Sequence, residues 1–340
     1  MIVNQKFIAQ EAGVSQKTVS LYFKERGLIG HKTREKIESV VKRHNYFPNA
    51  AARSIKSNRF NRIACVAAQY GSRDSVMHPH LMAYINGASL ELAQHGYSLV
   101  VEPVFIDLFG KEVNFPEFFS TRSADGVIGL PGGWIPPEVD KKIAELELPT
   151  IWLNRKSDNP DLTCLLFDET AGAVELARHF LEKGIRNIAW FGPEFKQDTV
   201  IHYSSRVRYE AVREELERNG GGCVPFYSHT GEALDGKARE LLAGLSRFDG
   251  VICYNYTYRQ TIFMEAIAAK VDLTKKRIGH FASMWEYHPR DYPSLDYVDM
   301  PEAEMGRRGA EYILRNLQEE STRELLVPLR GKLHTNDQTR

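Results

Sequence analysis

Residues 8–23 read IAQEAGVSQKTVSLYF, and this stretch predicts a helix, a tight turn and a second helix. Gly13 can adopt the left-handed backbone that ends a helix, and Ser15 is a good N-cap for the next one. Val19 and Phe23 lie four residues apart and are expected to face the first helix. The outer face then consists of Gln16, Lys17, Ser20 and Leu21. A helix-turn-helix presents its recognition helix in this way, although the pattern alone fits an ordinary helical hairpin better.

Positive charge is concentrated near this stretch. Residues 1–60 contain 12 lysines and arginines and 4 acidic residues, a formal charge of +8, whereas the rest of the 340-residue chain contains 32 and 40, a formal charge of −8. A basic head on an acidic body is typical of a protein that binds nucleic acid through its head. The charge pattern therefore favours a helix-turn-helix, and the length predicts two or three domains.

The cysteines and the hydropathy pattern limit the compartment. Cys65, Cys164, Cys223 and Cys253 are far apart and form no Cys-x-x-Cys pair, which predicts buried free thiols in a reducing compartment. Apolar runs stay well below the roughly 18 residues of a membrane helix, and residues 4–6 are polar where a signal peptide would be apolar. We expect a cytoplasmic protein with no membrane partner, no metal site and no cofactor.

The remainder of residues 1–60 is expected to be helical. Thr33 can cap a third helix, which ends before Pro48 because the residue preceding a proline disfavours the helical region. Residues 49–57 predict a short alanine-rich helix, and such a helix is too short to be stable alone in water. It therefore needs a partner, either a symmetry mate or DNA.

From residue 61 the sequence alternates between strands and helices. Strands are expected at 62–68, 97–102, 125–130, 150–153, 188–191, 224–227, 250–254, 276–281, 296–298 and 325–333, and helices at 80–95, 170–183, 206–219, 234–245, 259–270 and 303–319. Repeating strand–helix units predict parallel sheets with helices on both faces. Two sheets of about six strands would form two lobes with a ligand cleft at the carboxyl ends of the strands, as in periplasmic binding proteins.

The most specific motifs lie in the head. They are Ala12-Gly13-Val14-Ser15, Thr18-Val19-Ser20, Tyr46-x-Pro48-Asn49 and Ala52-Arg53-Ser54. At these spacings the chain resembles the lactose-repressor (LacI/GalR) family of bacterial transcriptional regulators, from about residue 3 to about residue 334. The resemblance implies a helix-turn-helix head over residues 1–48, a hinge helix and linker over 49–60, and a two-lobed effector-binding and dimerisation domain over 61–340.

The resemblance also assigns DNA contacts. Gln16, Lys17 and Leu21 match positions that read bases, since glutamine or lysine can bond purine edges and leucine can touch a thymine methyl group. Phosphate contacts fall to Ser15, Thr18, Ser20, Lys24 and Tyr46. The hinge helix would enter the minor groove with Ala52, Arg53, Ile55 and Lys56. Ile55 stands where the family carries a wedging leucine, and its β-branched side chain is stiffer.

The implied effector site is unusual for the family. It comprises His80, Asp168, Arg208, Tyr256 and Trp285. Arg208 stands where the family contacts a carboxylate or hydroxyls, which an arginine can bind in a bidentate manner. However, Asn255-Tyr256 replaces the usual Asn-Asp, and Asp168-Glu169 replaces Asp-Asn. The cleft could hold a sugar-like effector stacked on aromatic rings, or it could bind no small ligand and be regulated by a protein partner or not at all. Arg208 could also form only a helix-surface ion pair with Glu210 or Asp168.

Three functions remain to be compared. The first is a DNA-binding regulator, a repressor that binds a pseudo-palindromic operator as a homodimer and responds to an effector in the cleft. The second is an enzyme, which is disfavoured because residues 129–133 lack the order of a nucleotide loop and the histidines lack metal spacing. The third is a transport-type binding protein, which the basic head and the absent signal peptide argue against. Residues 334–340 carry no heptad, which favours a dimer over a tetramer.

Overall fold

The computed structural model describes residues 3–24, 26–47, 59–70, 81–107, 112–130, 135–157, 159–196, 201–228, 234–283 and 295–335. The chain divides into two compact units, Met1–Asn61 and Arg62–Arg340. The predicted hinge helix lies outside the described residues.

The first unit is helical. Its elements are α1 (Gln5–Ala12), α2 (Gln16–Lys24), a 3-10 turn (Arg26–Leu28) and α3 (His31–Arg43). Its core consists of Ile8, Ala9, Ala12, Val19, Tyr22, Ile29, Ile37 and Val40. The predicted Thr33 cap is wrong, because α3 begins at His31 after Gly30. Tyr22 is buried in this core, whereas Phe23 lies only partly buried at its edge.

The first lobe of the second unit contains a six-stranded sheet in the order β3-β2-β1-β4-β5-β6, in which only β3 is antiparallel to its neighbour. The strands are β1 (Arg62–Tyr70), β2 (Ser98–Ile106), β3 (Val113–Asn114), β4 (Gly126–Gly129), β5 (Thr150–Leu153) and β6 (Cys164–Leu165). One face packs against α6 (Phe118–Thr121) and α7 (Pro137–Ala144). The other face packs against α5 (Leu81–Gln94) and α12 (Glu302–Asn316). This lobe therefore has helices on both faces of a mostly parallel sheet.

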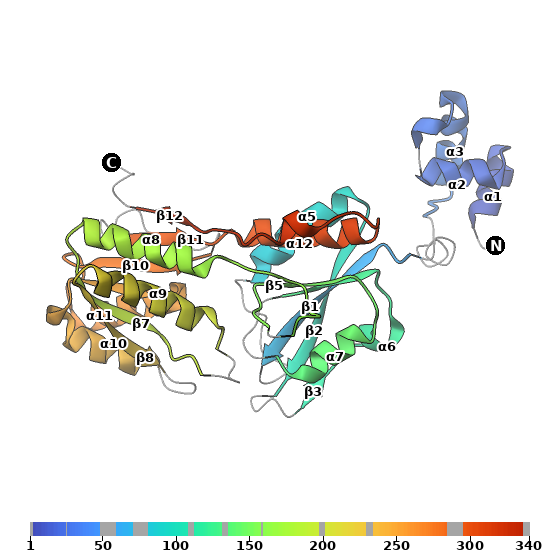
Figure 1. Ribbon diagram of the computed structural model, residues 1–340. Helices are drawn as coiled ribbons and strands as arrows, with labels where there is room; N and C mark the ends of the chain where they lie inside the picture. Colours follow the sequence, from blue (N-terminus) through green and yellow to red (C-terminus); the bar gives the residue numbers. More distant parts are fainter. Residues whose placement is uncertain are drawn as a thin grey trace. The chain divides into compact units, whose positions relative to one another are not determined.

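The second lobe repeats this plan, with the order β12-β11-β10-β9-β7-β8 and only β12 antiparallel. The strands are β7 (Asn187–Pro193), β8 (Gly222–Ser228), β9 (Gly250–Cys253), β10 (Arg277–Ala282), β11 (Leu295–Asp299) and β12 (Lys332–His334). The helices α8 (Glu169–Glu182) and α9 (Ser204–Arg218) cover one face, and α10 (Leu234–Ala243) and α11 (Tyr256–Ala269) cover the other. The two sheets confirm the predicted two-lobed α/β body (Figure 1).

The predicted last strand, 325–333, is mostly wrong. Residues Arg323–Leu326 form a 3-10 turn with Leu325 buried, and only Lys332–His334 pair with the sheet. Between them Leu329 forms a single bridge with Phe167. The segment is therefore a crossing from the first lobe to the second rather than a strand of one sheet.

The lobes share one hydrophobic cluster. It includes Leu153 in the first lobe, Ala173 in the second and Phe167 on the segment that joins β6 to α8. The four cysteines are free, and burial raises the pKa of Cys65 and of Cys253 to about 12. Because these two thiols stay protonated at neutral pH, they behave as small apolar side chains.

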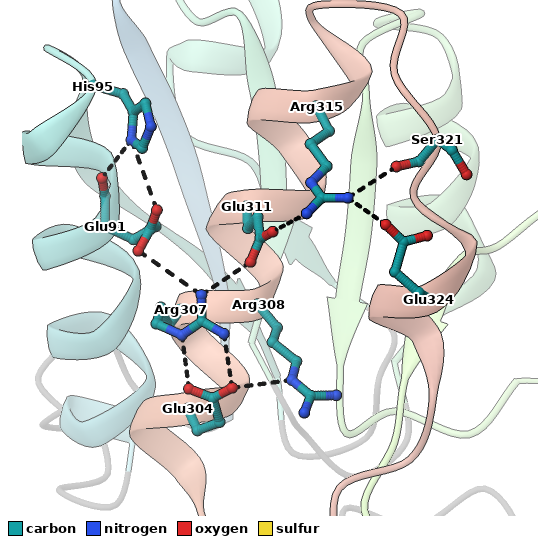
Figure 2. A network of polar contacts seen from close by, with 9 residues as sticks. All are labelled: Glu91, His95, Glu304, Arg307, Arg308, Glu311, Arg315, Ser321 and Glu324. Atoms are coloured by element: carbon teal, nitrogen blue, oxygen red, sulfur yellow. Dashed lines mark hydrogen bonds and ion pairs between the residues drawn. The ribbon is translucent and has the colours of Figure 1, made fainter.

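Helices α5 and α12 lie side by side in the first lobe (Figure 1). A Cβ on Gly87 would lie 1.9 Å from the carbonyl oxygen of Ala303, and one on Gly306 would lie 2.0 Å from that of Tyr84. Only glycine permits this backbone approach. Ion pairs line the same contact, since Arg307 binds Glu304 at 2.7 Å and Glu311 at 2.9 Å and reaches Glu91 of α5 at 4.0 Å (Figure 2). The last long helix is thereby fixed to the first lobe.

Candidate DNA-binding surface and effector site

The turn between α1 and α2 is fixed by local hydrogen bonds. The side chain of Asn4 caps α1 by accepting from the Phe7 N–H at 3.0 Å. Gly13 has φ +66° and donates its N–H to the end of α1, as its sequence position predicts. Ser15 Oγ accepts from the Thr18 N–H at 3.0 Å and so caps α2. Because these bonds join residues that are close in the sequence, the local sequence determines where α2 begins.

The two faces of α2 have opposite character. Val19 and Tyr22 are buried in the head core, whereas Gln16 and Lys17 are exposed in the first turn of the helix. Leu21 is half-buried and packs partly against the core, so it faces outward less fully than the sequence predicts. A side chain in this position has only part of its surface available to a ligand.

The predicted phosphate-contacting residues flank this face. Ser15 is exposed and its Oγ lies 2.8 Å from Thr18 Oγ1, while Thr18 and Ser20 are half-buried. The ring of Tyr46 packs edge-on against Phe23 at 5.8 Å between centroids, and burial raises the pKa of Tyr46. Its phenol therefore stays protonated and can donate a hydrogen bond at neutral pH. Lys24 is the last residue of α2.

The four predicted minor-groove residues lie outside the described residues. They are Ala52, Arg53, Ile55 and Lys56. Their roles remain predictions.

In the body, Arg208 of α9 forms a buried ion pair. Arg208 is 7% exposed, and its Nε donates to Glu169 Oε2 at 2.7 Å while Nη1 donates to the Tyr254 carbonyl oxygen at 3.2 Å. Burial acts to lower the pKa of Arg208, but the Glu169 carboxylate outweighs it and the pKa is raised. The predicted alternative was an ion pair on the helix surface with Glu210 or Asp168. It is wrong, because the partner of Arg208 is Glu169 and the pair is buried. Sequence reasoning missed Glu169, although its replacement of the family's asparagine was the available signal.

A hydrogen-bonded network connects this pair to the first lobe. Asn154, which directly follows β5, accepts from the Tyr203 hydroxyl on Oδ1 at 2.8 Å and donates from Nδ2 to Glu169 Oε1 at 3.4 Å. His202 Nε2 donates to the Asn154 carbonyl oxygen at 2.7 Å, because a carbonyl can only accept. His202 and Tyr203 precede α9 in the second lobe, so these bonds hold the lobes together at the carboxyl end of β5.

The protonation of His202 follows from its surroundings. Burial lowers the pKa of His202, so the imidazole is neutral at neutral pH. With its proton on Nε2, its Nδ1 accepts from Ser204 Oγ at 2.8 Å. Ser204 Oγ lies 2.9 Å from the hydroxyl of Tyr254, whose pKa burial raises. The network therefore consists of hydroxyl, amide and neutral imidazole groups around one ion pair.

The other predicted effector residues are only partly brought together. Asp168 caps α8 through the Ala171 N–H at 3.0 Å and lies 3.3 Å from Arg330. Tyr256 opens α11, and its ring lies 4.6 Å from the guanidinium carbon of Arg259. His80 and Trp285 lie outside the described residues. Of the three predicted effector residues that the structure describes, Arg208 belongs to this network through its hydrogen bonds to Glu169 and to the Tyr254 carbonyl oxygen.

Comparison with known proteins identifies the family. Residues 6–49 match the family described as bacterial regulatory proteins, lacI family. The HTH-type transcriptional regulator PtxS of Pseudomonas putida is 36% identical over 238 residues, which cover 66% of this chain and 67% of that protein. The HTH-type transcriptional regulator RegA of Clostridium saccharobutylicum is 26% identical over 216 residues, and the match spans 63% of this chain and 62% of RegA.

The fold is similar to that of a solved regulator. The crystal structure of the lac repressor dimer bound to operator and the anti-inducer ONPF superposes with a TM-score of 0.71 at 18% identity, covering 98% of each chain. The chain belongs to the lacI family of bacterial regulatory proteins. It is a DNA-binding transcriptional regulator with a body of the lac repressor fold.

The described residues contain no cluster of three or more histidine, cysteine, aspartate or glutamate side chains that could hold a metal ion. None of the helices in the described part of the chain is long and apolar enough to cross a membrane. The relatives named above are transcriptional regulators rather than enzymes.

Proposed function

We propose that the protein is a repressor that binds a pseudo-palindromic operator as a homodimer and responds to a small-molecule effector held between its lobes. The observation that carries the proposal is α2, a capped helix with Gln16 and Lys17 exposed in its first turn and Val19 and Tyr22 buried behind them. A recognition helix contacts base edges with its N-terminal residues.

The proposed contacts divide into two kinds. Gln16 and Lys17 read purine edges and Leu21 touches a thymine methyl group, each good bidentate contact being worth roughly 1–3 kcal/mol of discrimination. The contacts of Ser15, Thr18, Ser20, Lys24 and Tyr46 to phosphates position the head without reading sequence. The proposed hinge, residues 49–60, carries the minor-groove contacts of Ala52, Arg53, Ile55 and Lys56, between a head of residues 1–48 and a body of residues 61–340.

The body supports a homodimer and an effector. Each lobe carries a pair of exposed apolar side chains on one helix, Met82 and Leu90 on α5 and Met264 and Ile267 on α11. Such side chains can take part in a contact between subunits when they join a larger apolar patch. The lac repressor structure named above is a dimer bound to operator. An effector that binds near Arg208 would act by changing the bonds between the lobes, and thereby the spacing of the two hinges in the dimer.

The test uses the full chain and double-stranded DNA. Sites are selected from a randomised duplex pool, and affinity for the selected site and for a scrambled duplex is measured over a range of salt concentrations. We expect two inverted half-sites, one dimer per site and a steep salt dependence. Equal affinity for the selected and the scrambled duplex would contradict the proposal.

A further inference from the structure

The ion pair between Arg208 and Glu169 bears on the charge of the ligand. Arginine has five N–H donors. Of these, the Nε donor is directed at Glu169 and an Nη1 donor at the Tyr254 carbonyl oxygen. The guanidinium also lies 4.3 Å from the ring centroid of Phe281. The cation that would bind a ligand carboxylate is thus already neutralised within the chain.

Glu169 is held firmly in this position. It is 3% exposed and is the first residue of α8, where the helix dipole favours a negative charge. Its second oxygen accepts from Asn154 of the first lobe at 3.4 Å. A ligand carboxylate that approached Arg208 would therefore meet a fixed carboxylate of the same sign.

The first lobe contains a second buried arginine that is paired with an acidic residue. Arg155 follows Asn154 at the carboxyl end of β5 and is buried. Its two Nη atoms bind the two carboxylate oxygens of Asp140 on α7, and its guanidinium stacks on Trp152 at 4.4 Å. Arg155 follows Asn154 in the sequence, and Arg208 belongs to the network around Asn154. Each of these two arginines is thus paired with an acidic residue of the same chain.

The other groups of the network are uncharged. They are the hydroxyls of Tyr203, Ser204 and Tyr254, the amide of Asn154 and the neutral imidazole of His202. Hydroxyls and amides can each donate and accept, which suits the hydroxyl groups of a neutral ligand. In open α/β sheets ligands bind at the carboxyl ends of the strands, where this network lies.

We propose that Glu169 is a specificity-determining residue that makes the site between the lobes select an uncharged, polyhydroxylated ligand over the corresponding carboxylate. The inference rests on the proposed effector function and names the class of effector. Removing the charge of Glu169 leaves Arg208 uncompensated and converts the site to one that prefers acids.

The test compares neutral sugars with their own acids on the full-length protein. Glucose, galactose and ribose are each titrated beside the matching aldonic acid by calorimetry, at fixed ionic strength and neutral pH. At least one neutral sugar is expected to bind the wild-type protein about tenfold or more tighter than its acid. In Glu169→Gln the acid is expected to gain more affinity than the whole wild-type preference, so that the order reverses. Glu175→Gln makes the same charge change at an exposed position of α8 and should leave the ratio unchanged.

Three results would overturn the inference. The wild-type protein could bind every acid of the panel at least as tightly as its neutral partner, the ratio could stay unchanged in Glu169→Gln, or no sugar of the panel could bind either protein. The ratio of the affinities for a neutral sugar and for its acid can be measured on the wild-type protein without any variant. Glu169→Asp keeps the charge and provides a second comparison if Glu169→Gln does not fold. Operator binding measured on the same samples distinguishes a failure of this inference from a failure of the proposed function. Selective DNA binding without the sugar preference refutes only this inference, whereas loss of selective DNA binding by the wild-type protein refutes the proposed function.

Discussion

Replacing Arg208 by methionine should destabilise the body strongly. Arg208 and Glu169 are 7% and 3% exposed, so the substitution leaves a buried carboxylate whose remaining side-chain partner among the described residues is the Asn154 amide at 3.4 Å. Breaking a buried pair by removing one partner costs about 3–5 kcal/mol. Methionine fills much of the space of the aliphatic stem, which keeps the additional packing loss small.

The assay is urea unfolding of the full chain followed by tryptophan fluorescence, since Trp152 and Trp190 are buried in the two lobes. Arg239→Met is the matched control, because its Nε also lies 2.7 Å from a glutamate Oε2, that of Glu265, but its side chain is 63% exposed. Exposed pairs of this kind contribute little, so the control should unfold like the wild-type protein.

A third variant separates the two causes of the loss. In Arg208→Met/Glu169→Gln the stranded charge is gone, and part of the stability should return. If Arg208→Met unfolds at the same urea concentration as Arg239→Met, the buried ion pair does not exist in solution, and the site has no fixed carboxylate to select against charged ligands.

Three other predictions concern the caps, the helix contact and pH. Ser15→Ala should destabilise the head by about 1 kcal/mol, measured by thermal denaturation, while Ser15→Asp retains the cap. Gly306→Ala should destabilise the protein by about 1–3 kcal/mol or more because its Cβ would meet the Tyr84 backbone, whereas Gly236→Ala on α10 meets no atom within 4 Å and should stabilise it by up to about 1 kcal/mol. The lowered pKa of His202 means that the unfolded chain takes up the proton first, so stability should fall as pH drops below about 6.5. Urea midpoints in His202→Gln should lack this pH-dependent component, and equal slopes in both proteins would refute the assignment.

The sequence predicts the body well where the elements are long and periodic. The strand expected at 150–153 is β5 with the same bounds, and the helix expected at 170–183 is α8 shifted by one residue. In contrast, α7 is absent from the predicted helices, although Pro137 is its first residue and a proline is favoured in the first turn of a helix. The apolar residues at 325–333 predict a strand, but Leu325 lies in a 3-10 turn and Leu329 forms a single bridge with Phe167, an arrangement that no local pattern encodes.

The site was predictable only in part, for a physical reason. The capped turn of α1 and α2 depends on residues within a few positions of each other, and Gly13 and Ser15 behave as their types predict. The partner of Arg208 lies 39 positions away, and which acid it meets depends on how α8 and α9 pack. The link from His202 and Tyr203 to Asn154 spans the two lobes and has no sequence signature.

The recognition function of α2 can be tested directly by a triple substitution. The variant replaces Gln16, Lys17 and Leu21 together by side chains that differ in hydrogen-bonding capacity or polarity. Sites are then selected from a randomised duplex pool with the wild-type protein and the variant in parallel. The wild-type protein is expected to select one inverted-repeat sequence, and the variant should select a different half-site in the same inverted arrangement. If both proteins select the same sequence, these three residues do not read the bases, and the assignment of α2 as the recognition helix is contradicted.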